Sequence, residues 1–169
     1  MKQEDKELLL KDLCVRLPYG LKGKCEIDAS YDTSFDTIYQ IHKFDATLDG
    51  IKEDLLFVTP LIEDKDEQEF ANEEVADGID ILDFNPYLRP ISSMTEEEVD
   101  NLFHILKINE KNAKEWLKVN DIGIIRLFTE EGKDFYEIAE AIDYLNSIHI
   151  DYRELIEKGL ALEAPEEIY

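Results

Sequence analysis

The sequence predicts an α+β fold in which an N-terminal helix packs on a small antiparallel sheet and a mainly helical C-terminal half follows. Three observations predict it: a helical hydrophobic pattern over residues 2–17, short β-rich runs over 22–62, and further helical patterns beyond residue 94. We expect a single domain over residues 1–169, with two lobes as the alternative. The lobes would be 1–62 with the helix and the sheet and 84–169 as the mainly helical half, joined by an acidic connection over 63–83.

The composition is that of a folded and strongly acidic protein. Of the 169 residues, 44% are hydrophobic, which is enough to form a core. The 41 Asp and Glu residues outnumber the 18 Lys and Arg residues, and the formal net charge is -23. Such a surface repels nucleic-acid phosphates and anionic membranes, because binding to either needs a cationic patch. We therefore expect no direct nucleic-acid binding; a basic protein is the partner that the charge favours, and the oligomeric state stays open.

The first residues, MKQEDKELLL, lack the basic segment and the longer apolar run of a secretory signal. No stretch approaches the roughly 20 apolar residues that a membrane-spanning helix needs. These features predict a protein that does not bind a membrane and is located in the cytoplasm.

The first predicted helix spans Lys2 to Leu17. Its apolar residues recur at the i, i+3, i+4, i+7 spacing that lines one helical face, namely Leu10, Leu13, Cys14 and Leu17. Pro18 and Gly20 are expected to end this helix, because proline has no amide hydrogen to donate and glycine accepts the backbone angles of a reversal.

Three or four antiparallel strands are predicted between Lys22 and Ile62. KGKCEID alternates apolar and polar residues, TIYQIHKFDATL carries apolar residues on both faces, and LLFVTPLI is expected to be the most buried strand. Asp49-Gly50 is a favoured dipeptide for a tight hairpin, and Lys52-Glu53-Asp54 is the alternative place for the reversal. The sheet is expected to pack on the first helix, because a hairpin alone is only marginally stable in water.

An exposed loop or linker is predicted for residues 63–80, which carry nine acidic residues and one lysine. Asp64, Asp66 and Gln68 alternate as in a calcium loop, but Glu69 stands where such a loop needs glycine, so we expect no metal site. The imperfect alternation of Ile79, Ile81, Leu82 and Phe84 predicts a further strand, and the two prolines of NPYLRPISS, which follows it, exclude a regular helix.

The C-terminal half carries several helical patterns. Thr95 and Glu98 form a capping box, in which each side chain accepts a hydrogen bond from the other residue's amide. The helix behind the box is expected to bury Val99, Leu102, Phe103 and Leu106. A short helix over 111–119, an apolar run over 122–128 and the clearest helix of the chain over 133–147 follow.

The final residues, IDYRELIEKGLALEAPEEIY, are expected to belong to the fold rather than to form a loose tail. Asp151 is a predicted helix cap and Gly159 is placed for a left-handed stop, so Tyr152–Lys158 should form a short helix. The apolar residues after Gly159 extend the predicted order to about residue 164. Only EEIY is expected to be loose.

The candidate catalytic residues are His149, Asp151, Tyr152 and Arg153. They form the only local group that combines a base, a carboxylate, a phenol and a guanidinium, although the capping role already explains Asp151. The histidines His42, His104 and His149 belong to no metal-binding or catalytic motif.

The sequence lacks the signatures of nucleophilic catalysis and of phosphate binding. GxSxG, GxGxxG and GxxxxGK[ST] do not occur, so we expect no cofactor. Cys14 and Cys25 have no CxxC spacing, and we interpret both as buried free thiols, with a disulfide or a catalytic thiol as the alternative.

Three stretches are similar to known proteins: LLLKDLCVRLPYGLKGK, PYLRPISSMTEEE and IDYRELIEKGLALEAPEEIY. Together they resemble a family of small uncharacterised proteins of gut Bacteroidetes that is frequently associated with prophages and mobile elements. The resemblance spans most of the chain and implies a cytoplasmic accessory protein from a phage or mobile element. It implies no activity for any residue.

Three functions follow from these observations. The absence of a catalytic signature favours a non-enzymatic accessory or protein-binding module. One alternative is an acidic mimic of DNA that inhibits a basic host protein, which needs carboxylates along one convex face. The other is an enzyme that uses His149 or His42 beside carboxylates, which needs a pocket with a histidine and a perturbed acid.

Overall fold

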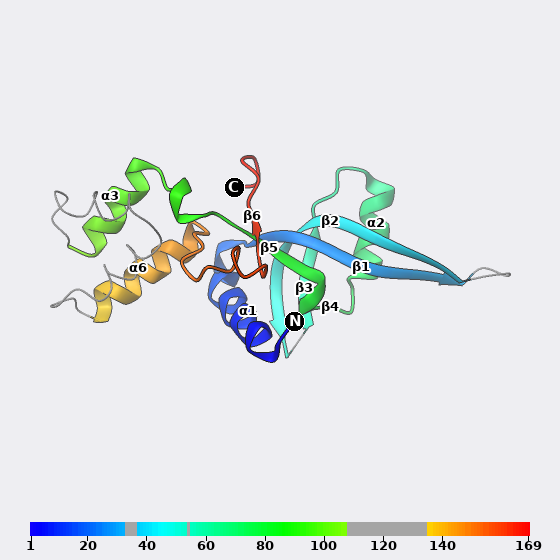
Figure 1. Cartoon of the computed structure of the whole chain (residues 1–169). Coiled ribbons are helices and arrows are strands. Elements are labelled where there is room, and N and C mark those ends of the chain that lie inside the picture. The colour runs from blue at the N-terminus through cyan, green and yellow to red at the C-terminus, as the bar shows by residue number, and fades with distance from the viewer. Residues whose placement is uncertain (33–36, 54, 108–134) are drawn as a thin grey trace. The chain divides into compact units, whose positions relative to one another are not determined.

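The computed structural model describes residues 1–32, 37–53, 55–107 and 135–169 (Figure 1). They form two compact units: unit 1 contains residues 1–87 and 159–169, and unit 2 contains residues 88–158. An N-terminal helix, a sheet and further helices are present, which confirms the predicted α+β class. The helix predicted over 111–119 and the apolar run over 122–128 lie outside the described residues.

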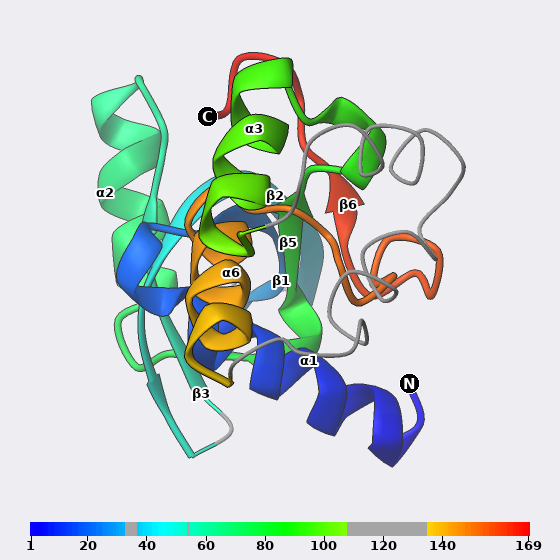
Figure 2. The ribbon, with the colours of Figure 1, turned by 90° about the vertical axis from the view of Figure 1, so that its left-hand side faces the viewer.

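Unit 1 is built on a six-stranded sheet with the strand order β4-β3-β2-β1-β5-β6. β1 pairs antiparallel with β2 and β5, and β3 pairs antiparallel with β2 and β4. The sheet exceeds the predicted three or four strands because three later segments extend it: β4 beside β3 at one edge, and β5 and β6 beyond β1 at the other (Figure 2). The strands are β1 (Lys22–Asp32), β2 (Thr37–Lys52), β3 (Leu55–Pro60), β4 (Ile79–Asp80), β5 (Phe84–Leu88) and β6 (Leu162–Glu163).

Helix α1 (Gln3–Arg16) runs beside the sheet in both views (Figures 1 and 2). The helix is predicted correctly, but its buried face is shifted by one position along the sequence toward the N-terminus. The buried residues are Leu9, Asp12, Leu13 and Arg16. Arg16 Nε donates to Asp12 Oδ2 at 2.7 Å, and both side chains are fully buried. An ion pair therefore makes up half of the face that α1 buries.

The reversal between β2 and β3 does not occur at Asp49-Gly50. β2 continues to Lys52, with a bulge between Leu48 and Gly50 that shifts its register against β3. In the bulge, Asp49 Oδ2 accepts a hydrogen bond from the Thr59 hydroxyl at 2.6 Å. The chain reverses after Lys52, as in the alternative prediction. β3 buries alternate residues, whereas β5 buries all its residues but Asn85, so β3 is not the most buried strand that was expected.

The acidic segment is not the loop that its composition predicts. Lys65–Glu74 form helix α2, and Asp64 Oδ1 caps it by accepting from the Asp66 and Glu67 amides at 3.0 and 3.1 Å. Carboxylates in the first turn also interact favourably with the positive end of the helix. The strand expected over residues 79–84 is limited to β4, because the 3₁₀ turn η2 (Ile81–Asp83) separates it from β5.

The C-terminal segment belongs to unit 1, down to the final tyrosine. Leu160 is only 5% exposed, and β6 lies beside β5 (Figure 2). The Tyr169 hydroxyl donates to the Tyr87 carbonyl at 3.0 Å and accepts from the Lys22 amide at 3.1 Å. Lys22 Nζ donates to the Ile168 carbonyl at 2.6 Å. The prediction of a loose EEIY is therefore wrong, because these residues bind the start of β1.

We expect Tyr169→Phe to lower the free energy of unfolding by about 1–2 kcal/mol, because it leaves the Lys22 amide and the Tyr87 carbonyl without this partner. Chemical denaturation followed by circular dichroism measures the change. Glu167→Gln, on the same segment, is the control and should leave the midpoint unchanged. Equal stability of the Tyr169→Phe variant and the unmodified protein would show that the hydroxyl does not hold the segment.

Unit 2 contains helices α3 (Glu96–Ile105) and α6 (Phe135–Ser147), which is close to the helix predicted over 133–147. The capping box is confirmed: Thr95 Oγ1 accepts from the Glu98 amide at 3.2 Å, and Glu98 Oε2 accepts from the Thr95 amide at 2.7 Å. Two hydrogen bonds from Arg89, at 2.7 and 2.9 Å, lower the pKa of the Glu98 carboxyl.

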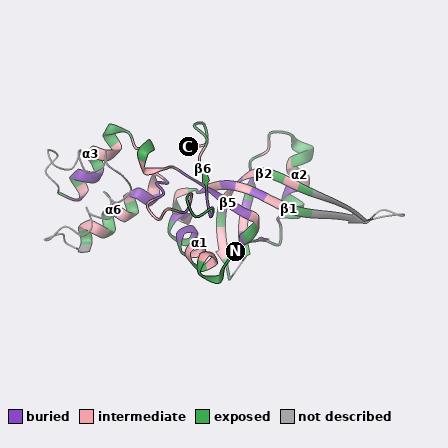
Figure 3. Ribbon diagram, in the orientation of Figure 1, coloured by how far each residue is buried: buried purple, intermediate pink, exposed green. Residues whose placement is uncertain are grey.

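The helices of unit 2 share a small hydrophobic core (Figure 3). Three of the four residues predicted for the buried face of α3 are fully buried there, and Val99 packs against them. The range 84–169, predicted to be mainly helical, also contains β5, β6 and the turns of residues 152–158. The buried residues of the core are Leu102, Phe103, Leu106, Ala141, Leu145 and Ile150.

Candidate functional site

The candidate site is a pocket of unit 1 between β2 and α2, which we call the β2–α2 pocket. Gln68 holds α2 at the end of β3: its Nε2 donates to the Pro60 carbonyl at 2.9 Å, and its Oε1 accepts from the Ile62 amide at 3.3 Å. Pro60 pairs with Ala46 of β2. The capped first turns of α2 are therefore held next to the middle of β2.

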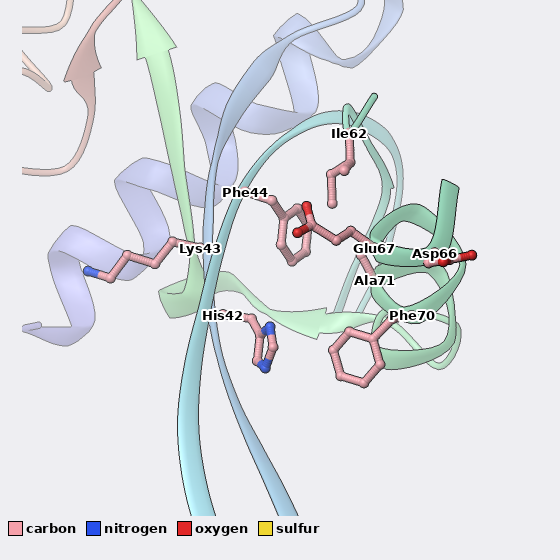
Figure 4. A pocket seen from close by; sticks show the side chains of 8 residues that line it. All are labelled: His42, Lys43, Phe44, Ile62, Asp66, Glu67, Phe70 and Ala71. Atoms are coloured by element: carbon pink, nitrogen blue, oxygen red, sulfur yellow. The ribbon is translucent and has the colours of Figure 1, made fainter. Parts of the chain in front are cut away.

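The β2–α2 pocket has a mainly apolar and aromatic lining (Figure 4). His42 and Phe44 of β2 point toward α2, because alternate residues of a strand face the same side. The rings of His42 and Phe70 lie 4.9 Å apart between centroids, with 44° between their planes. The pocket has a volume of about 410 Å³ and is lined by His42, Lys43, Phe44, Ile62, Asp66, Glu67, Phe70 and Ala71.

Glu67 gives the β2–α2 pocket a negative charge. Its side chain extends from α2 toward Phe44, whereas the Asp66 carboxylate points away from β2 (Figure 4). Within the described part of the chain, the Glu67 carboxylate has no hydrogen-bond or ion-pair partner. Lys43 points to the other side of β2, where its Nζ lies 3.0 Å from Glu26 Oε2. The carboxylate beside the aromatic rings is thus available to a cation from outside.

The β2–α2 pocket suits a cationic group on an apolar stem. A cation is attracted to the face of an aromatic ring, and an ammonium or guanidinium forms strong hydrogen bonds with a carboxylate. Lysine and arginine side chains combine such a head group with a methylene stem that an apolar lining buries. The pocket can therefore bind a basic side chain.

The candidate residues of the sequence analysis belong to unit 2 and are not among the residues that line the β2–α2 pocket of unit 1. His149 is buried, and its carbonyl accepts from the Arg89 amide at 2.8 Å. Both oxygens of Asp151 accept backbone hydrogen bonds, from the amides of Leu155 at 2.9 Å and Ile156 at 2.8 Å. Asp151 is thus a cap, as predicted, but it caps a turn.

The helix predicted for Tyr152–Lys158 is a series of turns. Glu154 adopts a left-handed backbone conformation with a φ of 60°, which interrupts a right-handed helix. The Tyr152 hydroxyl donates to Asn146 Oδ1 at 3.0 Å, and the Arg153 guanidinium lies 5.2 Å from the centre of the Tyr152 ring. A catalytic role for His149, Asp151, Tyr152 and Arg153 stays a prediction.

The two cysteines differ in their surroundings. Cys14 is exposed, so its predicted burial is wrong, whereas Cys25 is buried; both are free thiols. Burial, and then the charges of Asp83 and Asp45, raise the pKa of the Cys25 thiol to about 12. Cys25 therefore stays protonated near neutral pH, which makes it a poor nucleophile.

Sequence reasoning misses the β2–α2 pocket because the acidic composition of α2 is typical of a solvated loop. Of the three histidines, His42 is in this pocket and His104 is exposed on α3. The signal that finds the helix is Asp64 as a cap, followed by Phe70 and Ala71 on the face toward the strands.

Comparisons of the chain with protein-family models, with curated proteins and with solved structures found no match. Among the described residues, no three His, Cys, Asp or Glu side chains are grouped so that they could hold a metal ion. In the same part of the chain, every helix is too short or too polar to cross a membrane. The function must therefore be inferred from the pocket itself.

Proposed function

We propose that the protein is a non-enzymatic protein-binding module, and that it receives a lysine or arginine side chain of a basic partner in the β2–α2 pocket. The observation that carries this proposal is the Glu67 carboxylate, directed into an aromatic pocket and without a partner among the described residues. A formal net charge of -23 adds long-range attraction for a basic protein and accelerates its association. An accessory role of this kind agrees with the resemblance of the sequence.

Each alternative function leaves part of this pocket without a role. A mimic of DNA also binds a basic protein, but it uses arrayed carboxylates and has no need for an apolar pocket. The enzymatic alternative is favoured by one observation, the presence of His42 in a pocket with Glu67. The His42 ring, however, lies beside Phe70, where it forms part of the apolar lining. Recognition of a basic side chain uses both the lining and the carboxylate.

The test measures the binding of a labelled heptapeptide with a central lysine between threonine and valine residues. The control peptide has norleucine at the centre, which keeps most of the apolar stem and removes the charge. Fluorescence anisotropy should show at least about tenfold weaker binding of the norleucine peptide, because a hydrogen bond between charged groups contributes about 1.5–3 kcal/mol. Equal affinity for both peptides, or no binding of either, would contradict the proposal.

Glu67→Gln should weaken binding of the lysine peptide by about tenfold for the same reason. Glu73→Gln is the matched control, because it removes the same charge from an exposed position of α2 that does not line the pocket. Its affinity should stay within about twofold of that of the unmodified protein, as expected for a screened surface charge. Equal losses in both variants would indicate a diffuse charge effect and not a specific site.

A further inference from the structure

Beside the β2–α2 pocket, the edge of β2 that faces β3 is no longer paired with it. The register between β2 and β3 ends at Ala46 and Pro60, and one further backbone hydrogen bond joins the Leu61 amide to the Asp45 carbonyl at 2.7 Å. From Asp45 back to Thr37, the only pairing of β2 in the described chain is with β1. In Figure 1, β1 and β2 extend past β3 as a two-stranded ribbon.

The outward backbone groups of β2 can be assigned from two hydrogen bonds. The Leu48 amide donates to the Leu21 carbonyl on the β1 side at 2.8 Å, and the Asp45 carbonyl accepts on the β3 side. The backbone groups of successive residues point to opposite edges of a strand. The register of β2 with β1 has no shift, so the amides and carbonyls of Lys43 and Ile41 point to the β3 side.

These outward groups are free in the part of the chain that the structure describes. Among the described residues, the backbone groups of Ile41 and Lys43 have no partner on the β3 side. The Ile41 side chain is also 60% exposed, although it is a large apolar residue. An edge with unpaired backbone groups and exposed apolar surface is a template for an added strand.

We infer that the partner binds as an extended segment that pairs antiparallel with the outer edge of β2 at Ile41 and Lys43, in continuation of β3. This inference rests on the proposed function. Cross-strand neighbours face the same side of a sheet, so a residue opposite His42 or Phe44 would face the β2–α2 pocket. That residue is the basic one, next to Glu67. An adjacent apolar residue faces the opposite side, where it covers Ile41.

The charge of the protein argues for a basic segment and against a second copy of this chain as the occupant. Each copy carries a formal net charge of -23 over its whole chain. Like charges repel, and the two Glu67 carboxylates would stay without a cation. A basic segment instead adds opposite charge at the pocket and completes the hydrogen bonding of β2.

The experiment uses the full chain and three forms of the lysine heptapeptide. One is unmodified, one carries N-methyl groups on the alternate backbone amides that would donate to the Ile41 and Lys43 carbonyls, and one is methylated on the intervening amides. We expect the first methylation pattern to weaken binding at least about tenfold and the second to change it less than about threefold, because only the first removes hydrogen bonds. Whether the central lysine lies opposite His42 or opposite Phe44, its two neighbours lie opposite residues whose backbone groups point outward, so the sensitive pattern is the one that methylates the amides on either side of the lysine.

Amide hydrogen exchange with the unmodified peptide gives an independent readout. The amides of Ile41 and Lys43 should exchange at least about tenfold more slowly with the peptide bound, while the His42 amide, which faces β1, should change little. Another outcome is that the lysine peptide binds while both methylated forms bind as tightly as the unmodified one and the exchange rates of the Ile41 and Lys43 amides do not change. In that case strand pairing is wrong and the proposed function stands. If the lysine peptide does not bind, both fail. Light scattering that shows a dimer in the absence of peptide, with the same two amides protected, would assign the edge to a second copy and overturn the inference.

Discussion

Replacement of Arg16 by alanine is expected to lower the free energy of unfolding by about 3–5 kcal/mol. Arg16 and Asp12 are both fully buried, and the Arg16 Nε atom lies 2.7 Å from Asp12 Oδ2. The substitution takes this guanidinium away from a fully buried carboxylate, and removal of one partner of a buried ion pair is strongly destabilising. Urea denaturation followed by circular dichroism measures the loss.

The double variant Asp12→Leu with Arg16→Met is the control for this result. It replaces both charges by apolar side chains of similar length, and such replacements of buried ion pairs are often neutral or stabilising. We expect the double variant to recover at least half of the stability that Arg16→Ala loses. If Arg16→Ala costs less than about 1 kcal/mol, the pair is accessible to water and the buried charge does not determine the packing of α1.

Gly23→Ala is expected to lower the free energy of unfolding by up to about 3 kcal/mol, which is the upper end of the usual cost of an overpacked core. Gly23 of β1 pairs with Ala46 of β2 and with Pro86 of β5. A Cβ atom at this position would meet the Phe84 ring and lie 2.7 Å from the Asn85 carbonyl oxygen. The ring belongs to a fully buried side chain and the carbonyl to the paired strand, so neither can move away without loss of packing or pairing.

Gly50→Ala is the matched control, because Gly50 also lies in a strand of the same sheet. There, the nearest atom to an added Cβ is Phe57 Cβ at 3.6 Å, which is an ordinary contact. We expect a change within about 1 kcal/mol, since less conformational entropy in the unfolded chain offsets small adjustments. Thermal melts of the two variants, recorded together, separate the close approach at Gly23 from a general effect of glycine replacement. Similar melting temperatures would show that β5 is not tightly packed on β1.

Local signals in the sequence predict much of the secondary structure. The capping box of Thr95 and Glu98 forms as expected, and Gly159 has the predicted left-handed backbone, with a φ of 67°, although it follows turns and not the predicted helix. These features depend on neighbours within a few residues, and the hydrogen bonds that they make are the same in most proteins. For the same reason, the Asp64 cap of α2 could be recognised from the sequence, although the acidic composition favours a loop.

Other features depend on contacts between distant residues, and the sequence predicts them poorly. The α1 face is misplaced because a hydrophobic pattern treats Asp12 and Arg16 as surface residues, whereas in the fold they neutralise each other. The loose end predicted for EEIY is wrong because the Tyr169 hydroxyl binds Lys22 and Tyr87, which are far away in the chain. Neither contact has a signature within one segment.

By itself, the sequence determined the α+β class, the acidity of the protein and the helices α1, α3 and α6. The tertiary structure alone decided which residues share the β2–α2 pocket: the hydrogen bonds of Gln68 hold α2, with Glu67, at the end of β3, and β3 pairs with β2, which carries His42. It also decided where β3 leaves the edge of β2. Strand pairing and the docking of helices depend on many weak contacts between distant segments. Such contacts leave no pattern within any one segment from which they could be predicted.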